Sequence, residues 1–276
     1  MKRTLNCKGK PIDLSVPKVM GILNFTPDSF YDESRTNTDN TLLNKVEAML
    51  NDGATFIDVG AYSSRPGAPF VSEVVERERL IPALEVILKE FPEALISVDT
   101  FRSKIASEAI DMGAALINDI SGGDMDEDMF DLVADKQVPY VLMHRRGTPQ
   151  TMSSLNKYDH LILDIISELQ IKVRKLQEKG LNDIILDPGL GFAKNLDQNY
   201  EIVKELKSFK CLDHPLLVGA SRKSMINKLL GCEPKDALNG TTIVHTVSLL
   251  NGASILRVHD IKEAIEAVKI TNLLKK

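Results

Sequence analysis

Short apolar runs alternate with amphipathic stretches along the whole chain. The apolar runs begin near Val19, Phe56, Leu95, Leu116, Tyr140, Ile184, Leu216 and Ile255. Between them, apolar residues recur every three to four positions, for example over residues 40–50, 74–88, 161–176 and 261–274. This spacing is typical of helices with one buried face. Strands that alternate with helices form a parallel sheet, and eight such units favour closure into a (βα)8 TIM barrel of the α/β class.

Glycine separates several of the predicted helices from the strands that follow. Gly53, Gly113, Gly180 and Gly252 each stand just before an apolar run, where a left-handed residue can end a helix. The first residues follow another plan, because residues 4–14 surround a Lys-Gly-Lys turn. We expect this segment to be a hairpin that caps the bottom of the barrel.

Composition narrows the possible classes of protein. The chain has 276 residues, of which 43% are hydrophobic, so we expect one domain over residues 1–276. A net charge of -5 argues against nucleic acid or an acidic membrane as a partner. The three cysteines lack CxxC spacing, which favours a reducing cytoplasm. The longest apolar stretch, residues 241–256, contains polar residues and is too short to span a membrane.

Polar residues stand where nearly every predicted strand ends. They include Asn24, Asp58, Asp99, Asn118, Asp119, His144, Asp187, Ser221, Arg257 and His259. A single residue of this kind usually caps a helix or fixes a loop. So many of them together indicate a functional site at the mouth formed by the carboxyl ends of the strands.

Two aspartates and an asparagine are the candidate acceptors at this mouth. Asp99 and Asp187 follow separate strands, and ionised carboxylates only accept hydrogen bonds, so they suit a heterocycle with several N–H donors. Asn118 suits either kind of partner. A paired-carboxylate glycosidase site is the alternative. Because the same mouth is rich in cations, we rank ligand recognition above hydrolysis.

Cationic side chains come from loops that are distant in sequence. Arg65, Lys223, Arg257 and His259 follow the second, seventh and eighth strands, which are close together in a closed barrel. Barrel phosphate sites use the loops after strands seven and eight, so a diphosphate is the expected ligand. The remaining loop arginines are expected to be ordinary solvated surface residues: Arg102, Arg145 and Arg146.

The five histidines show neither HExxH nor His-x-His spacing, so a structural transition metal is not expected. Mg²⁺ is compatible with a diphosphate site, because it often takes only one or two protein ligands beside phosphate oxygens.

The order and spacing of these motifs resemble those of the dihydropteroate synthases over nearly the whole chain. The matching segments are Met20-Gly21-Ile22-Leu23-Asn24-Phe25-Thr26-Pro27-Asp28-Ser29-Phe30, Ile57-Asp58-Val59-Gly60, Ser63-Ser64-Arg65-Pro66-Gly67, Val98-Asp99-Thr100, Ile117-Asn118-Asp119, Met143-His144, Asp187-Pro188-Gly189-Leu190-Gly191-Phe192, Ser221-Arg222-Lys223 and Arg257-Val258-His259-Asp260. The resemblance implies a transferase of folate biosynthesis. It would condense 6-hydroxymethyl-7,8-dihydropterin diphosphate with p-aminobenzoate, giving 7,8-dihydropteroate and diphosphate.

The resemblance also implies roles for individual residues and a homodimer. Asn24 would contact Mg²⁺ and, with Arg65, Asp99 and Lys223, form the catalytic set. The pterin would be held by Asp99, Asn118, Asp187 and Lys223, the diphosphate by Ser64, Arg65, Arg257 and His259, and the p-aminobenzoate by Pro66, Phe192 and Ser221. Met143, Gly219 and Val258 complete the expected substrate contacts.

Two loops depart from the family pattern. The first loop has Tyr31-Asp32-Glu33-Ser34-Arg35 where a glycine pair is usual, and the second has Tyr62 in place of an acidic residue. Two other functions stay open at this point. One is a pterin-dependent corrinoid methyltransferase, although no Asp-x-His-x-x-Gly cobalamin signature occurs. The other is a pterin-binding protein without catalytic activity.

Overall fold

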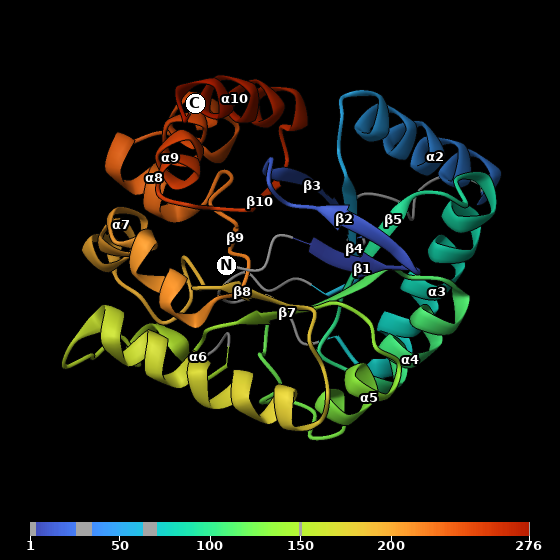
Figure 1. Cartoon of the computed structure of the whole chain (residues 1–276). Helices are drawn as coiled ribbons and strands as arrows, with labels where there is room; N and C mark the ends of the chain where they lie inside the picture. The colour runs from blue at the N-terminus through green and yellow to red at the C-terminus, as the bar shows by residue number, and fades with distance from the viewer. Residues whose placement is uncertain (1–3, 26–34, 63–70, 149–150, 276) are drawn as a thin grey trace.

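Eight parallel strands form the central sheet of the computed structural model, which describes residues 4–25, 35–62, 71–148 and 151–275. Their order is β8-β7-β6-β5-β4-β3-β10-β9. The bounds are β3 (Lys18–Asn24), β4 (Phe56–Gly60), β5 (Leu95–Asp99), β6 (Leu116–Asp119), β7 (Tyr140–Met143), β8 (Ile184–Asp187), β9 (Leu217–Val218) and β10 (Ile255–Val258). A parallel bridge between Leu186 and Leu216 joins the two ends of the sheet. This closure confirms the predicted barrel (Figure 1).

Helices surround the strands on the outside of the barrel (Figure 1). They are α2 (Arg35–Asn51), α3 (Glu73–Glu90), α4 (Ser103–Met112), α5 (Met129–Asp135), α6 (Leu161–Glu178), α7 (Leu196–Lys204), α8 (Ser224–Leu230), α9 (Leu238–Leu250) and α10 (Ile261–Leu274). Short 3-10 turns cover Met152–Ser154, Leu206–Leu212 and Pro234–Asp236. The four helices predicted from periodicity are all present. Helix α2 begins at Arg35, five residues before the predicted stretch. The sequence pattern misses these residues because the first turn is polar and shows no apolar periodicity.

The glycines predicted to end helices adopt the required conformation. Gly113 ends α4 with a φ of 112°, and its N–H donates to the carbonyls of Ala109 and Ile110. Gly53, Gly180 and Gly252 also have positive φ values, of 100°, 90° and 106°. A side chain with a Cβ is strained in this region, whereas glycine is not.

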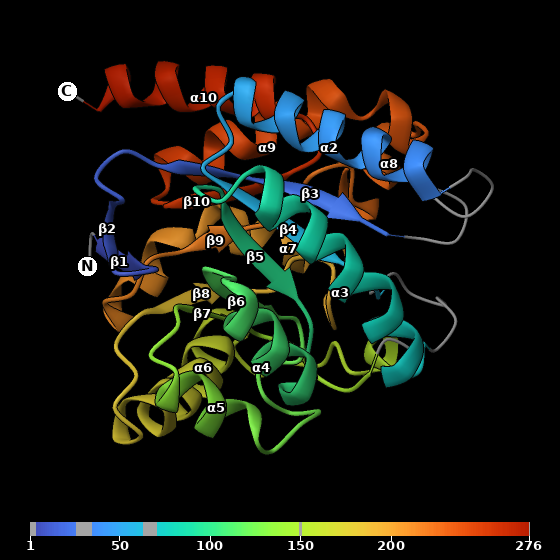
Figure 2. The same ribbon diagram turned by 90° about the vertical axis from the view of Figure 1, so that its right-hand side faces the viewer.

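The N-terminal hairpin consists of β1 (Thr4–Cys7) and β2 (Lys10–Asp13). Leu5 and Cys7 are buried in an apolar cluster with Met20 and Phe56, which are near the start of their strands. Figure 2 shows the hairpin at the end from which the arrows of β3 and β5 point away. The hairpin therefore caps the bottom of the barrel, as predicted, and leaves the opposite end for the site.

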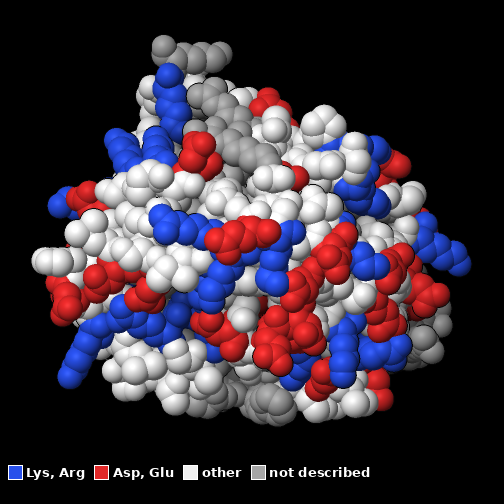
Figure 3. Space-filling view, turned by 60° about the horizontal axis from the view of Figure 1, so that its bottom comes forward, with Lys and Arg blue, Asp and Glu red and all other residues white. Residues whose placement is uncertain are grey.

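Charges of both signs cover the described surface over α5 and α6 (Figure 3). Lys172 and Lys179 pair there with Asp124 and Asp131. This face therefore presents no continuous basic surface. Among the described residues, every helix is too short or too polar to cross a membrane.

Candidate active site

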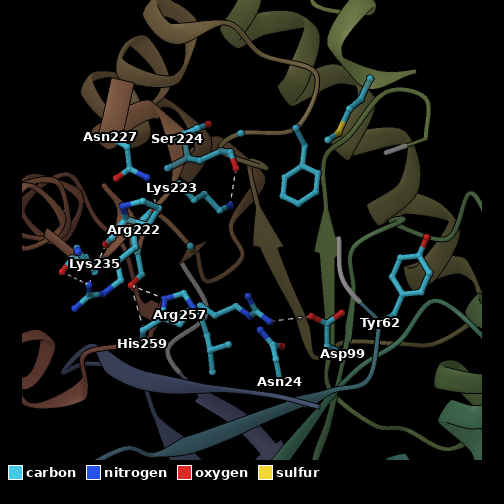
Figure 4. Close-up of a pocket in the computed structure, with 18 residues that line it drawn as sticks. Asn24, Tyr62, Asp99, Arg222, Lys223, Ser224, Asn227, Lys235, Arg257 and His259 are labelled. Carbon is cyan, nitrogen blue, oxygen red and sulfur yellow. Dashed lines mark hydrogen bonds and ion pairs between the residues drawn. The ribbon is translucent and has the colours of Figure 1, made fainter. Parts of the chain in front are cut away.

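A cavity of about 630 Å³ opens at the carboxyl ends of the strands. The predicted site residues that line it are Asn24, Asp99, Phe192, Gly219, Ser221, Lys223, Arg257 and His259. Figure 4 shows Asn24 of β3, Asp99 of β5, Arg257 of β10 and, from the loops after β9 and β10, Lys223 and His259 converging on it. Acidic and basic groups thus share one cavity, which is the arrangement that the strand-end pattern predicts.

Arg257 neutralises two buried carboxylates at the floor of the cavity. Its Nε donates to Asp58 Oδ2 at 2.5 Å and its Nη2 to Asp99 Oδ2 at 2.8 Å. Asp58 is fully buried, and it also accepts from Ser97 Oγ at 2.6 Å and Asn118 Nδ2 at 3.0 Å. Burial raises the pKa of Asp99, and the positive charge of Arg257 opposes that rise. Strands β4, β5, β6 and β10 are therefore joined by one polar cluster.

Lys223 supplies the second positive charge, beside Asp187. Its Nζ donates to the carbonyl of Leu190 at 2.6 Å and lies 4.9 Å from the centre of the Phe192 ring. Burial lowers the pKa of Lys223 to about 8, while the nearby Asp187 acts in the opposite direction. Burial likewise raises the pKa of Asp187, opposed by Lys223 and by the Gly189 N–H that donates to its Oδ1 at 2.7 Å.

The turn before α8 directs Lys223 into the cavity. Arg222 adopts a left-handed φ of 54° and forms a bidentate pair with Asp260, with donor–acceptor distances of 2.9 and 2.6 Å. Ser221 Oγ accepts from the His259 N–H at 3.1 Å and lies 3.0 Å from His259 Nδ1. Residues after β9 and β10 are thereby fixed to each other.

Some predicted contact residues do not reach the cavity. Asn118 lies behind Asp58, and the Met143 side chain packs in a buried apolar cluster with Phe192. Val258 is part of the helix-facing core, so its side chain points away from the site. Asp187 ends β8, close enough to the cavity-lining Lys223 for each charge to shift the other's pKa. Ser64, Arg65 and Pro66 lie outside the described residues.

The expectation of solvated surface arginines is wrong for Arg102 and Arg145, which are 7% and 5% exposed. Arg102 pairs with the buried Glu76 and donates to the carbonyl of Val71 at 2.5 Å. Arg145 donates to the carbonyl of Gly147 from its Nε at 2.9 Å. A buried guanidinium is tolerated when it is paired, and the partners are Glu76 in α3 and Val71 just before that helix for Arg102, and a local turn for Arg145.

Tyr62 and Lys194 belong to the site region although the sequence does not reveal their roles. Tyr62 lines the cavity and packs edge-on against Phe101, with ring centres 5.2 Å apart. Lys194 is close enough to Asp187 for each charge to shift the other's pKa. In the sequence, only the position of Tyr62 just after a strand indicates that it belongs to the site. Nothing in the sequence indicates Lys194, because a lone lysine is usually solvated.

Comparisons with known proteins agree on one family. The sequence model of the pterin binding enzyme family matches residues 20–259 of this chain. The chain is 40% identical over 268 residues to the dihydropteroate synthase of Escherichia coli (strain K12), covering 96% of this chain and 94% of that protein. The Yersinia pestis dihydropteroate synthase, in a sulfonamide drug complex, matches with a TM-score of 0.91, 39% identity and 99% coverage of both chains. The dihydropteroate synthase of Thermus thermophilus, in complex with 4-aminobenzoate, gives a TM-score of 0.88 at 35% identity, over 99% of this chain and 100% of that one. The chain therefore belongs to the pterin-binding enzyme family, among the dihydropteroate synthases.

Proposed function

We propose that this protein condenses 6-hydroxymethyl-7,8-dihydropterin diphosphate with p-aminobenzoate to give 7,8-dihydropteroate and diphosphate. The observation that carries the proposal is the placement of Asp99, Lys223 and Arg257 in one cavity. Carboxylates accept hydrogen bonds from the pterin N–H groups, and cations stabilise the diphosphate. A methyltransferase or a binding protein without catalytic activity has less use for these cations.

The reaction needs no nucleophile from the protein. The neutral aromatic amine attacks the methylene carbon of the pterin, a C–N bond forms, and the C–O bond to the diphosphate breaks. Diphosphate leaves with the bonding electron pair, and the amine nitrogen releases one proton. The protein's contribution is to hold the amine in line and to stabilise the departing negative charge.

The geometry of the described residues, and for Ser64, Arg65 and Pro66 the family resemblance alone, supports a division of roles at the site. Asp99, Asn118, Asp187 and Lys223 would hold the pterin. Arg257 and His259 would face the diphosphate, and Ser64 and Arg65 would join them. The p-aminobenzoate would contact Phe192, Ser221 and Pro66.

The donor set at Asn24 fits Mg²⁺ that arrives with the diphosphate. Asn24 ends β3, lines the cavity and offers one amide oxygen near the cationic side. Mg²⁺ often takes only one or two protein ligands beside phosphate oxygens, and the amide oxygen of Asn24 can supply one. Bound there, Mg²⁺ would offset negative charge on the diphosphate.

We further propose that the whole chain acts as one domain in a cytoplasmic homodimer. Apolar side chains on α9 and α10 support self-association, because several of them are strongly exposed: Ile243, Val247, Leu250, Ile270, Leu273 and Leu274. Contiguous apolar surface on a folded protein often marks an interface. No nucleic acid is expected, given the net charge of -5.

One steady-state assay tests the proposed activity. Diphosphate release is measured with Mg²⁺ and each substrate alone, and then with both. We expect release at a substantial rate only when both substrates are present. Tight pterin binding without turnover would instead support the non-catalytic alternative, and methyl transfer from methyltetrahydrofolate to a corrinoid would support the methyltransferase.

Replacing Asp187 with alanine is expected to weaken pterin binding by about 1–3 kcal/mol, because buried N–H donors of the ligand lose their acceptor. This corresponds to a dissociation constant about 5- to 150-fold higher. Calorimetry with a pterin ligand measures the change. Asp183→Ala, in the same region of sequence but before β8, serves as the control. An unchanged dissociation constant would remove Asp187 from the pterin site.

The pH dependence of activity follows from Lys223, whose pKa is lowered to about 8 by burial. As the pH rises through about 8, the lysine loses its charge, so kcat/KM is expected to fall. Stability changes in the opposite direction. The folded protein binds this proton more weakly than the unfolded chain does, so the free energy of unfolding rises from about pH 8 toward lysine's ordinary pKa. A pH profile of kcat/KM that stays flat to about pH 10, near the ordinary pKa of lysine, would contradict this assignment.

A further inference from the structure

A half-buried lysine, Lys194, contacts the substrate-facing loop after β8. Lys194 Nζ donates to the carbonyl of Phe192 at 2.8 Å and lies 3.0 Å from His144 Nδ1. On the cavity side, Lys223 Nζ donates to the carbonyl of Leu190 in the same loop. Residues 187–192 are thus held between two lysines.

The contacts of His144 continue this arrangement outward to α6. Because the Lys194 ammonium only donates, His144 Nδ1 must accept, and its Nε2 then carries the hydrogen. Nε2 lies 3.1 Å from Glu168 Oε2, so the ring donates to that carboxylate. Glu168 also pairs with Arg146. The hydrogen bonds therefore run in one direction, from Lys194 through His144 to Glu168.

Electrostatic interactions couple this series of hydrogen bonds to Asp187, the proposed pterin-binding carboxylate. Burial lowers the pKa of Lys194 to about 7, and Asp187 and Glu168 oppose that shift, whereas Lys223 and Arg146 add to it. Lys194 in turn holds down the pKa of Asp187. His144 is buried and its pKa is lowered to about 4, first by burial, so its ring transmits hydrogen bonds without a charge of its own near neutral pH.

The surroundings of Lys194 restrict what else it could do. Gly189 approaches His144 so closely that a Cβ there would lie 1.9 Å from the His144 carbonyl oxygen and 3.3 Å from Lys194 Nζ. The outer side of His144 borders a cavity of about 200 Å³ that Glu168 and Lys172 also line. Lys194 therefore lies between the loop and the histidine, and it is not among the described residues that line the main cavity.

We propose that Lys194 is a positioning residue for pterin binding: its charge, held by His144 and Glu168, fixes the loop and keeps Asp187 in its hydrogen-bond-accepting form. This inference rests on the proposed function. It goes beyond a structural brace, because a brace requires only a hydrogen-bond donor, whereas support of Asp187 requires a positive charge.

Three substitutions separate these roles. Lys194→Met removes both donor and charge, Lys194→Gln retains an amide donor without charge, and Lys194→Arg retains both. Lys172→Met is the matched control, because Lys172 lines the outer cavity and pairs with Asp124 at 2.7 Å without touching the loop. Pterin binding is measured by calorimetry at a pH of about 6.5, below the lowered pKa of Lys194, and thermal unfolding checks that each variant is folded.

We expect Lys194→Met and Lys194→Gln each to weaken pterin binding by about tenfold, the effect of one pKa unit of lost charge interaction. Lys194→Arg and Lys172→Met should stay within about threefold of the parent. If the methionine variant does not fold, the glutamine variant decides. Parent-like binding by Lys194→Gln would overturn the proposal and would show that Lys194 acts only as a hydrogen-bond donor that holds the loop. Diphosphate release by the parent protein separately tests the proposed function, so the two failures are distinguishable.

Discussion

Arg257→Met is expected to lower the free energy of unfolding by about 3–5 kcal/mol, because removing one partner of a buried ion cluster leaves the others uncompensated. The Arg257 side chain is 19% exposed, and Asp58 and Asp99 are 0% and 8% exposed. Both carboxylates are too buried for water to replace the lost positive charge. Urea unfolding of parent and variant measures the loss, and diphosphate release should be abolished as well.

A second substitution distinguishes charge from packing. In the double variant Arg257→Met with Asp99→Asn, one of the two unpaired charges is gone, so part of the lost stability should return. If packing of the arginine stem were the cause, the double variant would be no more stable than the single one. A single variant within about 1 kcal/mol of the parent would contradict the assignment of Arg257 as the counter-charge.

Lys223→Met is expected to reduce kcat/KM by about 10²–10³-fold, the usual effect of losing one preorganised charge or donor that stabilises a reacting anion. The free energy of unfolding should fall less than in Arg257→Met, because Lys223 Nζ donates to the carbonyl of Leu190, whereas Arg257 is hydrogen-bonded to two buried carboxylates. Arg257→Met should therefore lower both stability and activity, whereas Lys223→Met should lower mainly activity.

Lys204→Met provides the control for Lys223→Met. Lys204 is 80% exposed and pairs only loosely with Glu205 at 3.5 Å, so its loss removes one positive charge without disturbing the cavity. It should match the parent in both assays. Activity of Lys223→Met within about tenfold of the parent would exclude Lys223 from the reacting charges.

The barrel was predictable from sequence because burial imposes a period on the chain. Strands β7 and β8 are buried along their whole length, and such strands read as mainly apolar runs. The position of the site was predictable because polar residues such as Asp99 and Asp187 stand at the carboxyl ends of strands that are mainly apolar.

Contacts between side chains that are distant in the sequence were not predictable from it. Arg102 and Glu76 are 26 residues apart, and nothing in either segment shows that they meet in a buried pair. Lys194 looks like any surface lysine until the loop after β8 places it against His144. The first turn of α2 was missed for a simpler reason, because it contains no apolar residue that marks a buried face.

The contacts of Arg257 also bear on how a growing polypeptide reaches its final form. The arginine follows Asp58 by 199 residues and Asp99 by 158, so a ribosome exposes both acids long before it delivers their counterion. Contacts of such long range form late and slowly. A chain still awaiting its eighth barrel strand therefore lacks both the closed ring and a competent catalytic centre, and during biosynthesis the two arise in the same final docking event.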